Sequence, residues 1–187
     1  LFIPIMPLCS EGQMNAWLIN LMRANSRQPD QLEGDVYALV ASNETGADRL
    51  LRMMDEYELD EIDGLSEHIL ETSDQSMHEA VRAMPQGEWS SAMRIDGFDQ
   101  PLDLVTTLQI DEDYINIDFT GTSGTSPYGI NCPLCYTDAY TSFGAKCLVA
   151  PHLANNAAVL ARIRVTAPEG CLVNAPFPSP VATRQVI

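Results

Sequence analysis

Apolar side chains recur every three or four residues through the first half of the chain. Between residues 36 and 54 they follow the spacing i, i+3, i+4, i+7, which predicts a long amphipathic helix. Asn43 lies inside this stripe, where a buried amide would need hydrogen-bond partners in a neighbouring element, a partner protein or a pocket. A second stripe occupies residues 69–84, and the short connection between the two predicts an antiparallel helical hairpin. Ahead of both, Asn15 is expected to cap a shorter helix that ends at Pro29.

The period of the pattern changes to two after residue 88. Residues 102–110 alternate over a full strand, and shorter alternating runs at 93–95 and 115–119 flank it across turn-like links. This arrangement predicts an antiparallel meander of three strands. A helix over residues 137–149 and a strand over residues 159–166 are expected next. In that helix the side chains expected to point inward are Ala139, Tyr140, Phe143, Cys147 and Leu148.

The predicted fold class is therefore α+β, with an antiparallel helical hairpin followed by a mainly antiparallel sheet and an added helix. Residues 1–85 form the helical part of this prediction, and residues 86–187 form the sheet-containing part. A chain of 187 residues is long enough for one domain with a real core, or for two small subdomains. Because the sequence starts at Leu1 and stops without a tail-like composition, we expect a fragment of a longer subunit.

The charge of the chain narrows the choice of partners. Ten basic and 26 acidic residues give a formal net charge of -16, which repels phosphate backbones and argues against nucleic-acid binding. No apolar run approaches the roughly 20 residues that a membrane span needs. Five cysteines are an odd number in a chain with enough apolar residues for a core, so a reducing cytoplasm is expected.

Residues with catalytic potential are few. Cys132 and Cys135 form a CxxC pair without the further ligands of a zinc site, so they are interpreted as ordinary thiols. His68 and His78 point to different faces of one predicted helix. The loop 121–124 lacks the lysine of a Walker A motif and is interpreted as a connector. From the residues alone, the chain is predicted to be a soluble cytoplasmic module.

Four segments nevertheless stand out in order along the chain. They are residues 3–12 followed by Asn15 and the run 21–29, the stretch 34–47, the runs 117–123 and 129–133, and the run 165–174 continued by residues 178–182. Together they resemble the B-type subunit of the ATP-dependent hydantoinase/5-oxoprolinase/acetone carboxylase family. Each motif is weak alone, and the order of the four makes the resemblance specific.

The resemblance implies an enzyme subunit that binds a small organic substrate. In the family an A-type subunit carries ATP, and the pair opens a cyclic amide such as hydantoin, a lactam or 5-oxoproline. The implied chemistry is activation of a carbonyl oxygen by phosphorylation. Family members are several hundred residues long, and a divalent metal is implied only for an upstream His- and Asp-rich region, so no metal ligand is assigned here. Two departures from the family pattern are the missing glycine at residues 155–157 and a cysteine at position 135.

Three residues in or beside the matching segments are the candidates for substrate contact. Asp118 ends an apolar strand at the glycine-containing loop, and its alternative role is to hold that loop by hydrogen bonds. Asn131 could orient a substrate carbonyl or could form an Asx-turn. Arg184 could bind a carboxylate or phosphate with two parallel hydrogen bonds, or could make a local salt bridge.

Two other functions stay open at this point. One is a subunit of an ATP-dependent acetone or acetophenone carboxylase, which these residues do not separate from a cyclic-amide hydrolase. The other is a non-catalytic assembly module, since the chain shows no recognisable nucleophile. The isolated segment is expected neither to hydrolyse ATP nor to open a lactam.

Overall fold

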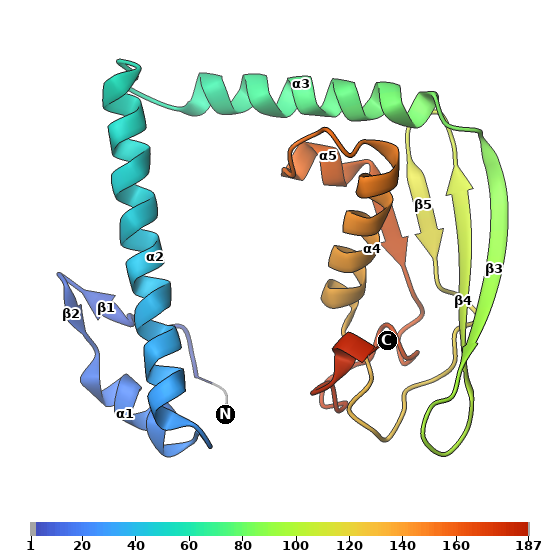
Figure 1. The fold of residues 1–187 in the computed structure, drawn as a ribbon, viewed down its shortest axis with the longest axis horizontal. Helices are drawn as coiled ribbons and strands as arrows, with labels where there is room; N and C mark the ends of the chain where they lie inside the picture. The colour runs from blue at the N-terminus through green and yellow to red at the C-terminus, as the bar shows by residue number, and fades with distance from the viewer. Residues whose placement is uncertain (1–2, 187) are drawn as a thin grey trace. The chain divides into compact units, whose positions relative to one another are not determined.

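The computed structural model describes residues 3–186. It contains two structural units, Leu1–Ile62 and Asp63–Ile187 (Figure 1). The first unit opens with strands β1 (Cys9–Ser10) and β2 (Gln13–Met14), which pair as a two-stranded antiparallel ribbon. The ribbon leads directly into helix α1 (Ala16–Ala24). As predicted, Asn15 caps this helix, because its side chain accepts a hydrogen bond from the backbone N–H of Leu18.

Helix α2 (Pro29–Glu56) is the longest element of the first unit. The prediction that Pro29 ends the preceding helix is wrong, because α1 stops at Ala24 and Pro29 occupies the first turn of α2. Proline is tolerated there because the first N–H groups of a helix have no partner within the helix. Arg23 joins the two helices through its bonds to Asp30 and Glu33.

The predicted apolar stripe of α2 is largely exposed in the structure. Val36 is the buried residue of this helix, whereas Leu39 and Leu51 are 65% and 63% exposed. Asn43 is exposed as well, so it has no need of the buried partners that the sequence suggested. The regular spacing of apolar residues therefore predicted the helix correctly, but it did not predict what this unit buries.

The second unit contains a four-stranded sheet of order β3-β4-β5-β6. Strands β3 (Gly87–Ile95), β4 (Leu102–Ile110) and β5 (Ile115–Asp118) are antiparallel neighbours, which confirms the predicted meander. Strand β6 (Ile163–Thr166) runs parallel to β5 at the edge. The strand expected over residues 159–166 is shorter than predicted, because helix α5 (Ala157–Ala161) occupies its first part. Asn156 caps that helix by accepting from the N–H of Val159.

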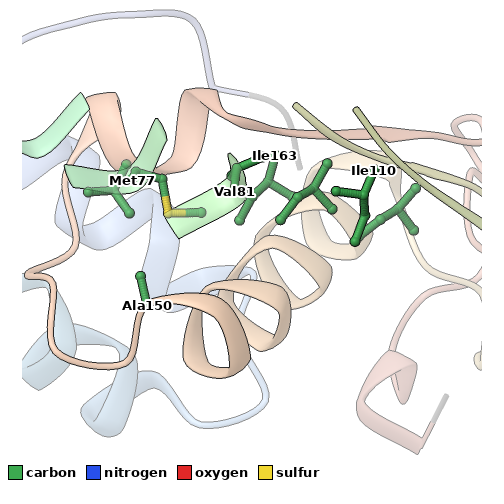
Figure 2. Close-up of a cluster of buried hydrophobic side chains, with 8 residues drawn as sticks. Met77, Val81, Ile110, Ala150 and Ile163 are labelled. Atoms are coloured by element: carbon green, nitrogen blue, oxygen red, sulfur yellow. The ribbon is translucent and has the colours of Figure 1, made fainter. Parts of the chain in front are cut away.

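Helix α3 (Asp63–Arg82) supplies one side of the main hydrophobic core. Its residues Met77 and Val81 are completely buried against isoleucines of the sheet, among them Ile110 and Ile163 (Figure 2). Ala150, just after helix α4 (Leu134–Val149), belongs to the same cluster. A smaller core lies at the other end of the sheet and consists of Leu102, Ile130 and Leu172.

Polar contacts fix α3 to the strands as well. The guanidinium of Arg162, which follows α5, donates two hydrogen bonds to Asp74 of α3 at 2.6 and 2.5 Å. A third bond from Arg162 reaches the carbonyl oxygen of Asp113 in the β4–β5 turn. Arg164 of β6 extends this set of contacts, because its guanidinium lies 3.3 Å from the centre of the Tyr114 ring. This network joins α3, the β4–β5 turn and β6.

The predicted orientation of α4 is wrong. Tyr140, Phe143 and Leu148 are 64%, 53% and 85% exposed, whereas Thr137, Ser142 and Lys146 are buried. The helix therefore packs its small and polar side toward the unit and presents large apolar side chains outward.

The α+β class with a mainly antiparallel sheet and an added helix is confirmed. Helix α3 packs within the second unit, against α5 and the sheet, so its predicted hairpin with α2 stays a prediction. The division into a helical part, residues 1–85, and a sheet-containing part, residues 86–187, also stays a prediction. It sorts the chain by type of secondary structure, whereas the two units of the structure are defined by contacts between residues.

Candidate functional site

The parallel pair β5–β6 brings distant segments of the chain together. Both strands end at the same edge of the sheet, so the loops that leave them, residues 119–133 and 167–184, meet there. We call these two segments the loop cluster. Backbone hydrogen bonds cross between them, from Leu172 to Ser123 at 2.8 Å, from Cys132 to Leu172 at 2.8 Å and from Thr183 to Gly129 at 2.8 Å. Most of the residues that carried the family resemblance in the second half of the chain therefore meet in one place.

Where β5 ends, hydroxyl groups of the loop 121–124 replace strand pairing as hydrogen-bond partners of β4. Beyond β5, the backbone N–H of Asp103 donates to Ser123 Oγ at 2.8 Å, and that of Val105 donates to Thr122 Oγ1 at 3.0 Å. Gly121 has φ +98, and a Cβ atom there would lie 3.3 Å from the Val105 side chain. The loop is thus fastened to the edge of β4, in agreement with its interpretation as a connector.

Asp118 holds the start of this cluster. Its carboxylate accepts a hydrogen bond of 2.7 Å from Thr166 Oγ1 of β6. Hydrogen bonds from the hydroxyl of Thr120, then from Thr166, hold the pKa of Asp118 below its usual value. A carboxylate in these contacts stays ionised and ties β6 to the loop after β5, which agrees with the alternative role considered for it. Substrate contact by Asp118 stays a prediction.

Asn131 is completely buried and fastens three segments to one another. Its Nδ2 donates to the carbonyl oxygens of Ser126, Tyr128 and Pro180 at 2.9, 2.9 and 2.8 Å, and its Oδ1 accepts from the N–H of Ser126 at 2.7 Å. An amide nitrogen has two hydrogens, so at least one of these three bonds is shared. The donors of Asn131 are thus engaged by backbone, and its contact with a substrate carbonyl stays a prediction.

Arg184 is the cation of this cluster. It lies in the short helix η1 (Arg184–Val186), where its Nη1 donates to the carbonyl oxygen of Val181 at 3.0 Å. Its guanidinium lies 5.2 Å from the centre of the Tyr136 ring. Within residues 3–186 no ion pair joins Arg184 to an acidic side chain, in contrast to the paired Arg23, Arg94 and Arg162. The guanidinium thus keeps donors for an incoming anion or carbonyl.

A cavity of about 150 Å³ lies beside these residues. It is formed by Leu104 of β4, Phe119, Val173 and the first turns of α4, including Tyr136 and Tyr140. The two tyrosine rings are 4.5 Å apart. The η1 helix lies near the N-terminal end of α4 (Figure 1). The cavity therefore combines an apolar wall with tyrosine and threonine hydroxyls, next to a half-buried arginine.

Cys132 and Thr137 also belong to this cavity. From the sequence, Cys132 is interpreted as an ordinary thiol of the CxxC pair, and Thr137 is not among the candidates. The buried Cys132 thiol donates to the carbonyl oxygen of Arg184 at 3.5 Å, and burial raises its pKa, although Arg184 opposes the rise. Thr137 Oγ1 donates to the carbonyl oxygen of Val173 at 2.7 Å. The spacing of Tyr136 and Tyr140, one helical turn apart after Pro133, was the available signal for this wall of the cavity.

The groups around this cavity are an arginine guanidinium, tyrosine and threonine side chains and an apolar wall. Because its pKa is raised, Cys132 stays a protonated thiol, which is a poor nucleophile. The described residues 3–186 contain no group of three His, Cys, Asp or Glu side chains able to hold a metal ion.

All five cysteines are free, and Cys135 is exposed whereas Cys132 is buried. None of the helices in the described part is long and apolar enough to cross a membrane.

Comparison with known proteins gives consistent matches. The sequence model of the hydantoinase B/oxoprolinase family matches residues 1–187. The B-type subunit of a "Putative D-/L-hydantoinase" from Pseudomonas sp. (strain NS671) is 29% identical over 93% of this chain and 32% of its own length. An uncharacterised protein of Methanocaldococcus jannaschii is 28% identical over 100% of this chain and 33% of its own length.

A solved structure shares the fold. The crystal structure of the ATP-dependent caprolactamase from Pseudomonas jessenii superposes with a TM-score of 0.79 at 24% identity, over 96% of this chain and 32% of that chain. The chain thus spans about a third of the length of the relatives that it matches. Because the family model matches the full sequence, the chain belongs to the hydantoinase B/oxoprolinase family.

Proposed function

We propose that this chain is part of the B-type subunit of an ATP-dependent cyclic-amide hydrolase, which acts on a hydantoin, a lactam or 5-oxoproline. The observation that carries the proposal is the family match over residues 1–187. Two named relatives point to the same class of reaction. One is the hydantoinase B-type subunit, and the other is the beta chain of the Pseudomonas jessenii caprolactamase, which is 28% identical over 47% of this chain.

ATP belongs to a partner subunit in this proposal. The loop 121–124, the obvious candidate for phosphates in the chain, lacks a lysine, and its hydroxyls are already bonded to β4. The related caprolactamase is an ATP-dependent enzyme. An A-type subunit would transfer the γ-phosphoryl group of ATP to the amide oxygen of the substrate and release ADP. Water would then attack the activated carbon, the ring C–N bond would break, and inorganic phosphate would leave. The resemblance implies a divalent metal only for an upstream region. Residues 3–186 contain no set of ligands for a metal ion, and no step of this proposal uses one.

The role proposed for this segment is to bind and orient the organic substrate. Arg184 would hold the substrate carboxylate, carbonyl or phosphorylated oxygen through its free guanidinium donors. Asp118 and Asn131 would fix the loops that place Arg184, and they are the further candidates for substrate contact. The apolar wall at Leu104, Phe119 and Val173 would accommodate the ring carbons.

The test uses the whole B-type subunit, purified together with its A-type partner. Ring opening is followed by chromatography with hydantoin, caprolactam and 5-oxoproline as substrates, and ATP cleavage is measured in parallel. Ring opening that requires both ATP and the partner supports the proposal. ATP cleavage that depends instead on acetone or acetophenone with bicarbonate would make the protein a ketone carboxylase. If ring opening and ATP cleavage both continue when the B-type subunit is omitted, the subunit is an assembly module.

A further inference from the structure

A broad apolar groove lies between the sheet and α4. It has a volume of about 330 Å³, and the side chains that face it include Thr106, Leu108 and Ile117 of the sheet region and Thr141, Ala145 and Leu148 of α4. Ile110, Ile115 and Ile117 belong both to this groove and to the main hydrophobic core. The groove is thus an open continuation of the core and not a separate surface feature.

The apolar surface extends past the groove onto the edge strand. Trp89 and Met93 of β3 pair with Leu108 and Leu104 of β4, so they lie on the face of the sheet that lines the groove. They are 46% and 57% exposed, and Leu148 across the groove is 85% exposed. Soluble proteins rarely leave contiguous apolar surface of this kind in water, so something covers it in the intact protein.

The dimensions of the sheet indicate what kind of element fits. Strands lie about 4.8 Å apart and a helix is about 10 Å wide, so one helix covers about two strands. Helix α4 packs along β6, at the opposite edge of the sheet from β3 (Figure 1). The space over β3 and β4 therefore has the width of one further helix beside α4. Its lining is apolar apart from two threonines, which calls for an amphipathic helix whose apolar face meets the sheet.

We infer that an amphipathic helix from the same B-type subunit, outside residues 1–187, docks across β3 and β4 beside α4. The source of such a helix is the two-thirds of the relatives' length that this chain does not span. An element in the same chain is favoured over a partner because the groove continues the main core, which a subunit must complete in order to fold. This inference rests on family membership and not on the proposed activity.

The first test is photo-crosslinking in the full-length subunit. p-Benzoylphenylalanine replaces Leu148, and a second variant carries it at Ala92. Ala92 is a matched control because it pairs with Val105 and shares its face of β3 with Glu88, Ser90 and Arg94, which are polar. At high dilution, the probe at 148 is expected to link to a helical segment of its own chain outside residues 1–187, and the probe at 92 is not. A link from 148 to helix α2, whose Leu39 and Leu51 are exposed, to a second copy or to the A-type subunit, or no link at all, overturns the inference.

A second measurement covers the case in which the probe disturbs folding. In the full-length subunit, Met93→Lys is expected to lower the Tm by more than about 5 °C, because the charge would be buried under the docked helix. Ala92→Lys is expected to change the Tm by about 1 °C or less. Equal and small effects of the two variants would show that the groove faces water. A difference that appears only above a dimerisation concentration, seen by light scattering, would assign the surface to a second copy.

Discussion

The amide nitrogen of Asn131 donates a hydrogen bond to the carbonyl oxygen of Pro180, 2.8 Å away and 49 residues later in the chain. The same nitrogen contacts the carbonyl oxygens of Ser126 and Tyr128, so one buried side chain holds the turn 126–128 against the proline-rich segment. That segment leads directly to Arg184. The position of the proposed substrate-binding arginine therefore depends on an amide at the other end of the loop cluster.

Replacing Asn131 with alanine should destabilise the protein by about 2–4 kcal/mol. The change leaves buried carbonyl groups and the N–H of Ser126 without partners, and each such group is costly. Urea unfolding followed by circular dichroism measures the loss. Asn155→Ala is the control, because Asn155 is exposed and should change stability by about 0.5 kcal/mol or less. Equal stabilities of the two variants would contradict the clamp assigned to Asn131.

The turn between β3 and β4 has a strict requirement at Gly97. This residue has φ +61, and a Cβ atom there would lie 2.1 Å from the carbonyl oxygen of Gln100. Gly97→Ala should therefore lower the free energy of unfolding by about 2 kcal/mol or more, through strain and displacement of the turn. Gly34→Ala should instead raise it by about 0.5–1 kcal/mol, because Gly34 is helical and has open space around it. Thermal unfolding of both variants gives the two signs, and a loss at Gly34 or none at Gly97 would refute the local geometry.

The alternating pattern of the sequence was sufficient to predict the meander, because residues 102–110 place their even-numbered side chains on one face and their odd-numbered ones on the other. It was insufficient for α4. The prediction for α4 used the rule that large apolar side chains point into the core of the same segment. Leu148 is exposed and does not follow this rule. A further element of the subunit that packs on Leu148 would account for the exception.

The candidate site could be predicted only in part, for a different reason. Asp118, Asn131 and Arg184 were selected by resemblance. The structure places Asn131 and Arg184 in the loop cluster and Asp118 at the end of β5 that leads into it. Their hydrogen bonds were not predictable from spacing, because Asn131 and Pro180 meet only after the parallel pairing of β5 and β6 has aligned two loops. Cys132 and Thr137 escaped selection because their roles come from contacts with Arg184 and Val173, far along the chain.

Acid should weaken the contact between Asp74 of α3 and Arg162, the residue before β6. The two hydrogen bonds from Arg162 hold the pKa of Asp74 below its ordinary value of 3.8, and the charge of Arg162 adds to this. A lowered folded-state pKa gives a stabilisation that is full above pH 3.8 and is lost as the pH falls through the folded value. Asp74→Asn should therefore cost about 0.5–1 kcal/mol near pH 7, a modest figure because the Asp74 side chain is 42% exposed.

Urea unfolding between pH 7 and pH 3 checks this dependence. The difference between the natural protein and Asp74→Asn should shrink as the pH falls below 3.8 and Asp74 becomes protonated. Asp48→Asn, which removes an exposed carboxylate of α2, is the matched control variant. A difference that stays constant down to pH 3 would mean that the carboxylate of Asp74 adds no stability through its charge.

Arg184 provides the sharpest test of the proposed substrate site. In the complete enzyme with its A-type partner, Arg184→Gln should raise KM for the cyclic amide by about 10–100-fold, since a charge-assisted hydrogen bond contributes roughly 1.5–3 kcal/mol. Arg184→Lys keeps the charge but not the paired geometry, so its KM should lie between those of the other two forms. Arg27→Gln is the control, because Arg27 is exposed in the connection before α2. If Arg184→Gln lowers the Tm and leaves KM unchanged, its bond to Val181 and its contact with Tyr136 are structural, and substrate binding must be sought elsewhere in the protein.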